Sequence, residues 1–142
     1  MRIIFLGRTP LHAALMAARI YLEDQWEPAE ISRGWPDLSH DLSGPPVYIG
    51  SDSGGTEVYT LGGGRDLAMV KKSIEDLRDI LGFQPKDLLV IPVSTRWDGL
   101  LGLMALIPSI IGGRRLNQVA SLLLLRGQEK DLIELTAKAK QV

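Results

Sequence analysis

The sequence of 142 residues contains no cysteine. This absence excludes a disulfide framework, a thiolate nucleophile and a zinc site with sulfur ligands. Histidine is scarce as well, because His12 and His40 are the only two. Few side chains therefore titrate near neutral pH, which narrows the choice of a general acid or base.

Neither sign of charge is in excess. Lys and Arg together number 16 and Asp and Glu together number 17, so the formal net charge is −1. Dedicated nucleic-acid-binding proteins normally carry a basic excess, so we expect no nucleic-acid partner. Apolar residues make up 45% of the chain, which together with its length predicts one globular domain over residues 1–142.

A long hydrophobic run is missing too. The longest uncharged stretch, residues 99–113, has 15 residues and contains Pro108, whereas a membrane-spanning helix needs about 20 apolar residues. Arg8 and Pro10 interrupt the apolar N-terminal stretch, so it does not form the hydrophobic region of a signal peptide. We therefore expect a cytoplasmic protein without a membrane span.

What the sequence does contain is an alternation of apolar segments. Short apolar runs predict strands over residues 2–6, 47–49, 58–61, 88–91 and 119–125. Helical spacing and capping residues predict helices over residues 10–22, 67–81, 98–111 and 128–140. This order predicts an α/β fold, a three-layer sandwich around a mixed, mostly parallel sheet of about five strands with one β-hairpin. Residues 23–46, rich in proline and acidic side chains, form a long connection that is a candidate lid.

The most regular of these helices follows Asp66, a favoured N-cap residue, and stops at Gly82. One stripe along this helix is apolar. Its members are Leu67, Val70, Ile74, Leu77 and Leu81.

The turn between the first strand and the first helix is the strongest candidate site. Open α/β sheets bind ligands at loops that leave the carboxyl ends of parallel strands, and a helix N-terminus after a glycine turn favours an anion. Gly7 makes this turn, and Arg8, Thr9 and His12 supply a charge, a hydroxyl and a titratable group. The alternative is a structural turn in which Thr9 caps the helix and Pro10 begins it.

A second glycine-rich turn, GGGRD at 62–66, precedes the helix that Asp66 caps. Gly63 and Gly64 allow a ligand to approach the backbone closely, and Arg65 lies near the helix start. A flexible turn ahead of a capped helix is the alternative. If both turns lie at one edge of the sheet, they form one site, with Gly7, Arg8, Thr9, His12, Gly63, Gly64 and Arg65 as its ligand-binding residues.

Other polar loops have simpler explanations. Hydroxyl and charged side chains follow the strand at 88–91, and paired arginines follow a double glycine; solvated loops account for both. These side chains are Ser94, Thr95, Arg96, Asp98, Arg114 and Arg115.

A metal site and a catalytic motif are not expected. Asp37, His40 and Asp41 have short spacing, but aspartate-rich loops rarely hold a metal without a supporting cluster, so we expect no metal and no cofactor. No spacing selects a Ser–His–Asp triad, and the Rossmann fingerprint and phosphate loop are missing.

Four segments occur in a fixed order: IIFLG at 3–7 followed by His12, VYIG at 47–50, VYTLG at 58–62 and IIGGRR at 110–115. In this respect the chain resembles an uncharacterised bacterial family, a domain of unknown function from spore-forming, Gram-positive lineages. That family's first loop reads Gly-Gly, a small residue, His and two serines, whereas this chain reads RTPLHAA at 8–14. The chain keeps the histidine but not the glycines or serines, so it looks like a divergent member. The resemblance implies the fold and no particular activity.

Two functional hypotheses follow. In the first, a small cytoplasmic α/β protein binds a phosphate-bearing or other anionic small ligand at the sheet edge. If it catalyses a reaction, His12 is the candidate general acid or base. In the second, a non-catalytic interaction module forms a homo-oligomer through the apolar segment 97–111.

Overall fold

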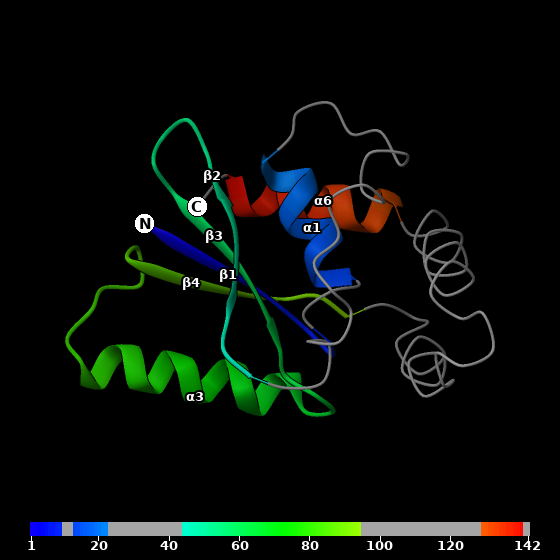
Figure 1. Ribbon diagram of the computed structural model, residues 1–142. Coiled ribbons are helices and arrows are strands. Elements are labelled where there is room, and N and C mark those ends of the chain that lie inside the picture. The colour runs from blue at the N-terminus through cyan, green and yellow to red at the C-terminus, as the bar shows by residue number, and fades with distance from the viewer. Residues whose placement is uncertain (10–12, 23–43, 95–128, 141–142) are drawn as a thin grey trace.

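The computed structural model describes residues 1–9, 13–22, 44–94 and 129–140, which form an α/β fold (Figure 1). Its strands are β1 (Arg2–Gly7), β2 (Val47–Ser51), β3 (Glu57–Gly62) and β4 (Leu88–Pro92), and its helices are α1 (Ala13–Leu22), α3 (Leu67–Ile80) and α6 (Glu129–Lys140).

The strands form one open, mixed sheet in the order β2-β3-β1-β4. The central strand β1 runs parallel to β3 on one side and to β4 on the other. β2 pairs antiparallel with β3, which makes the hairpin that the sequence predicts, with an irregularity between Tyr48 and Gly50. Helices α1 and α6 lie on one side of this sheet and α3 lies on the other (Figure 1).

The core lies between the sheet and α1. Ile3 and Phe5 of β1 are fully buried on this side, together with Val58 of β3. Four alanines of α1 face them, and such small side chains let the helix approach the strands closely. These alanines are Ala13, Ala14, Ala17 and Ala18.

The hairpin turn is fastened to α1 through Asp52. The Asp52 carboxylate accepts hydrogen bonds from the amides of Gly54 and Thr56 at 2.9 and 2.8 Å, and from the Tyr21 hydroxyl at 3.3 Å. The bond from the Thr56 amide contributes most to lowering the pKa of Asp52. The acidic turn therefore stays ionised and holds β2 and β3 against the end of α1.

The structure confirms the predicted strands near the N-terminus, in the hairpin and at 88–91, and the helices at 67–81 and 128–140, with ends that differ by a few residues. The first predicted helix is present as α1 from Ala13 onward, and its predicted start at Pro10 lies outside the described residues. The predicted helix 98–111, the predicted strand 119–125 and most of the candidate lid also lie outside them. The five-stranded sheet and the three-layer sandwich therefore stay predictions. None of the described helices is both long and apolar enough to cross a membrane.

The sheet covers the apolar stripe of α3 only in part. The helix forms, but none of its residues is buried, and Leu77 is 55% exposed. Leu81, just past its end, is 61% exposed. The reason is that α3 packs mainly on β4 and β1, so the carboxyl-terminal half of its stripe faces outward.

Two buried threonines differ in how their hydroxyls are satisfied. The Thr60 side chain on β3 is fully buried, and its Oγ1 has no hydrogen-bond partner. The Thr136 side chain on α6 is also buried, but its Oγ1 donates to the Ile133 carbonyl at 2.9 Å. A buried hydroxyl without a partner costs free energy that an apolar group of the same shape does not.

We therefore expect the substitution Thr60→Val to raise the free energy of unfolding by about 1 kcal/mol, because it removes the unpaired hydroxyl and keeps the shape. Thr136→Val, the matched control, should lower it by about 0.5–1 kcal/mol, because it removes a made hydrogen bond. Urea unfolding of both variants measures these changes. A loss of stability in Thr60→Val equal to that in Thr136→Val would contradict the finding that the Thr60 hydroxyl has no hydrogen-bond partner.

Candidate functional site

The two glycine-rich turns meet at one edge of the sheet. The Gly63 amide donates to the Gly7 carbonyl at 2.8 Å, and the Gly64 amide donates to the Arg8 carbonyl at 3.1 Å. These bonds continue the parallel pairing of β1 with β3, which ends at Gly7 and Gly62. The loops at 7–9 and 63–65 are thus joined by their backbones.

Space is tight at both sides of this junction, and at Gly7 the nearest atom belongs to the backbone. A Cβ added at Gly7 would lie 2.7 Å from the Thr9 carbonyl oxygen and 2.9 Å from the Ala14 Cβ. A Cβ at Gly63 would lie 2.9 Å from side-chain carbons of Leu6 and Leu67. The absence of a side chain at Gly7 therefore lets the first loop approach α1 closely. The absence of one at Gly63 lets the second loop approach Leu6 and the start of α3.

Gly64 has a different role, since its φ angle is +67°, in the left-handed region that favours glycine. The next residue, Arg65, is exposed, while Arg8 and Thr9 on the neighbouring loop are half-buried. Within the described residues, neither Arg8 nor Arg65 pairs with a carboxylate. The two loops therefore carry two guanidinium groups and one hydroxyl.

The amino terminus of α3 is already capped. The Asp66 carboxylate accepts a hydrogen bond from the Met69 amide at 2.9 Å, as the sequence predicts. This carboxylate satisfies one of the free amides and places a negative charge at the positive end of the helix. An anion at the junction must therefore be held by the loop residues and not by the end of α3.

Several predicted residues lie outside the described residues. His12 is one of them, and so are His40 and the other members of the metal hypothesis. Ser94 is described, and it is exposed just after β4. The other polar residues of that loop and the paired arginines after the double glycine lie outside the described residues. The junction thus brings together Gly7, Arg8, Thr9, Gly63, Gly64 and Arg65 from the predicted set.

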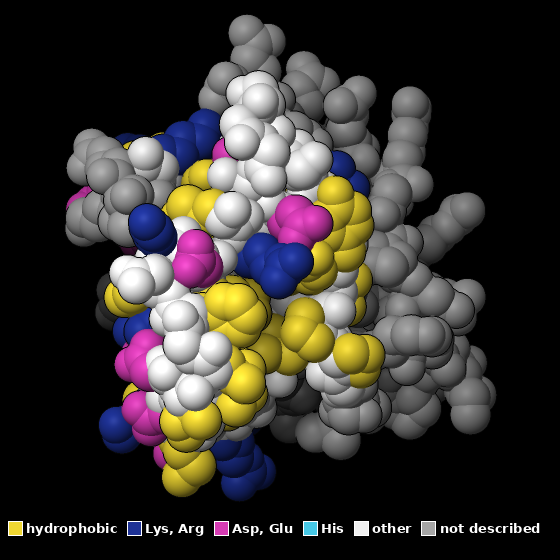
Figure 2. Space-filling view, turned by 90° about the vertical axis from the view of Figure 1, so that its left-hand side faces the viewer, with side chains coloured by type: hydrophobic (Ala, Val, Ile, Leu, Met, Phe, Trp, Pro, Cys, Tyr) yellow, Lys and Arg dark blue, Asp and Glu magenta, His cyan; other side chains and the backbone are white. Residues whose placement is uncertain are grey.

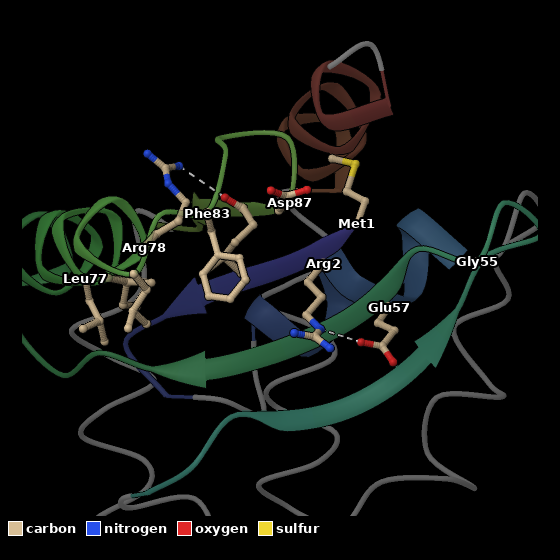
Figure 3. A pocket seen from close by; sticks show the side chains of 11 residues that line it. Met1, Arg2, Gly55, Glu57, Leu77, Arg78, Phe83 and Asp87 are labelled. Carbon is tan, nitrogen blue, oxygen red and sulfur yellow. Dashed lines mark hydrogen bonds and ion pairs between the residues drawn. The ribbon is translucent and has the colours of Figure 1, made fainter.

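A groove at the opposite edge of the sheet was not expected from the sequence (Figure 3). It has a volume of about 630 Å³ and lies where β1 and β3 begin, beside the end of α3. Its apolar lining includes Met1, Ile74, Leu77, Leu81, Phe83 and Leu88. One feature of the sequence does indicate this groove. The apolar stripe of α3 is long and continues past Ile74 to residues that the sheet does not cover.

The charged side chains around this groove already have partners. Arg2 donates to the Glu57 carboxylate at 2.8 Å, and this hydrogen bond is the main cause that holds the pKa of Glu57 below its ordinary value. Arg78 pairs with Asp79 at 2.7 Å and also donates to the Leu88 carbonyl. The groove is therefore lined largely by apolar side chains, with the paired Arg2 and Glu57, Arg78 and the carboxylate of Asp87 also in its lining.

Comparison with known families gives one match. The model of a family described as "Protein of unknown function (DUF3189)" matches residues 2–141, nearly the whole chain. The chain belongs to the DUF3189 family. This membership confirms the resemblance to an uncharacterised domain family, while the bacterial, spore-forming lineage stays a prediction. No curated protein and no solved structure matches this DUF3189 chain.

We expect the substitution Gly7→Ala to destabilise this DUF3189 protein by about 2 kcal/mol, because the added methyl group overlaps the Thr9 carbonyl and Ala14. Gly54→Ala is the comparison variant, since its Cβ would lie 3.3 Å from the nearest atom, the Asp52 Oδ1, a longer contact than the 2.7 Å at Gly7. Thermal unfolding of both variants gives the comparison. Equal midpoints for the two variants would contradict the close approach at the junction.

Proposed function

We propose that the protein binds a phosphate-bearing or other anionic small ligand at the carboxyl-terminal edge of the sheet. The observation that carries the proposal is the pair of hydrogen bonds from the Gly63 and Gly64 amides to the Gly7 and Arg8 carbonyls. These bonds join two loops that are 56 residues apart in the sequence, from 7 to 63 and from 8 to 64. This closeness of the two backbones supports a shared site for Arg8, Thr9 and Arg65.

The chemistry of these side chains supports an anionic ligand. Guanidinium groups form charge-assisted, often bidentate hydrogen bonds to phosphate and carboxylate, and a threonine hydroxyl donates one more. Nearby glycines leave the backbone accessible to a ligand of small size.

The cap at the start of α3 shapes the specificity. Asp66 repels a ligand that approaches that helix end directly, so the ligand is favoured on the side of the first loop. His12 belongs to the same loop in the sequence, and its role as a general acid or base stays a prediction because it lies outside the described residues. The proposal is accordingly one of binding and not of a reaction.

The second hypothesis, self-association through residues 97–111, concerns a segment that lies outside the described residues. It stays a prediction. No contact of the described residues favours it over the anion site.

The proposal predicts that inorganic phosphate, pyrophosphate or a nucleotide raises the thermal midpoint of the protein, by mass action. At a concentration one hundred times the Kd, the added stability is about 2.7 kcal/mol. Arg8→Ala and Arg65→Ala should each reduce the shift. The double variant should reduce the shift at least as much as the stronger single variant, because both guanidinium groups would contact the same ion.

Lys86→Ala is the charge-matched control, since this exposed lysine lies in the loop before β4, away from the junction. It should keep the full shift. An equal reduction in Lys86→Ala would mean general electrostatic attraction, and no shift with any anion on folded protein would overturn the proposal.

A further inference from the structure

Two tyrosine rings lie on a part of the sheet that α3 leaves open. Tyr48 on β2 and Tyr59 on β3 are cross-strand neighbours, and their ring centroids lie 5.4 Å apart in an edge-to-face arrangement. The Tyr48 residue is 55% exposed, and Tyr59 is half-buried. Exposed rings of this kind offer a flat apolar surface on which a planar ligand can stack.

The Tyr59 ring lies on the same face of the sheet as α3. Side chains alternate along a strand, and Val58 and Thr60 on either side of Tyr59 are buried, Val58 in the core beneath α1. Tyr59 therefore points to the other face, where its hydroxyl donates to the Glu57 carboxylate at 3.2 Å. The same carboxylate accepts a hydrogen bond from Arg2. Because α3 packs mainly on β4 and β1, this face stays open over β3 and β2.

The second glycine-rich turn continues from the strand that carries Tyr59. Gly62, the last residue of β3, follows Tyr59 by three residues, which is about 10 Å along a strand. Arg65 comes next but two and directly precedes Asp66, the cap of α3, so it belongs to the loop that leads to the same face of the sheet. The charge of this loop and the tyrosine rings therefore lie on one face, at successive positions along β3.

From this arrangement we propose that the anionic ligand is a nucleotide, whose phosphate groups bind at the loops of Arg8 and Arg65 and whose base stacks on Tyr48 beside Tyr59. This inference rests on the proposed anion site and adds the class of its ligand. Guanidinium groups suit the phosphate groups, and an aromatic ring suits any base, since every base has a planar face. A sugar with one or two phosphate groups bridges the interval between the rings and the loops.

The charge of the chain favours a single nucleotide over a nucleic-acid strand. A strand is bound along its backbone by a groove with an excess of basic side chains. The formal net charge of this chain is −1, and the two proposed phosphate contacts, Arg8 and Arg65, belong to one junction. One nucleotide uses both of these contacts and the exposed ring.

The experiment is calorimetric titration of the full chain with ADP and with pyrophosphate, which carries two phosphate groups but no base. ADP should bind about 10-fold more tightly, because only ADP stacks on the ring. Tyr48→Ala should weaken ADP binding by about 10-fold and leave pyrophosphate binding unchanged, whereas Tyr48→Phe should keep both, since it keeps the ring. Circular dichroism checks that both variants fold.

Phe83→Ala is the matched control. Phe83 is 53% exposed, but it lies at the groove on the opposite edge of the sheet, on the side of the molecule where hydrophobic side chains gather (Figure 2). Its loss should change neither affinity. Equal affinities for ADP and pyrophosphate, unchanged in Tyr48→Ala, would overturn the nucleotide inference and leave the anion site standing. No binding of either compound to folded protein would overturn both.

Discussion

The parallel pairing of β1 with β3 is the constraint on which the rest of the structure depends. β1 lies between β3 and β4, and Ile3 and Phe5 on it are fully buried beneath α1. Parallel strands end at the same edge of a sheet, so the residues after β1 and β3 are brought together whatever the length of chain between them. The hydrogen bonds from the Gly63 and Gly64 amides to the Gly7 and Arg8 carbonyls extend this pairing, and the junction of the two loops follows from them.

Much of this arrangement could be predicted from the sequence, because it rests on local patterns. The apolar run at 2–6 predicts a strand buried on both faces, and the β-branched and aromatic residues around the turn at 51–56 predict the hairpin. Asp66 and Gly82 mark the ends of α3 correctly, since capping chemistry is local. The sequence alone does not determine whether the two glycine-rich turns meet, because strand order is set by tertiary packing and not by any single segment.

The outward face of α3 could not be predicted in the same way. Its apolar periodicity shows which residues share a face, but not how far the sheet extends beneath that face. Leu77 and Leu81 continue the stripe of Val70 and Ile74, yet they are more than half exposed because α3 packs mainly on β4 and β1.

The central claim is that the loops at 7–9 and 63–65 form one anion site. The most direct test is a ¹⁵N–¹H correlation spectrum of the protein, recorded during titration with inorganic phosphate. The account predicts that the amide signals of both loops shift together along one saturable curve, while those of Leu77 and Phe83 at the opposite edge stay in place. Shifts confined to one loop, or different midpoints for the two loops, would contradict it.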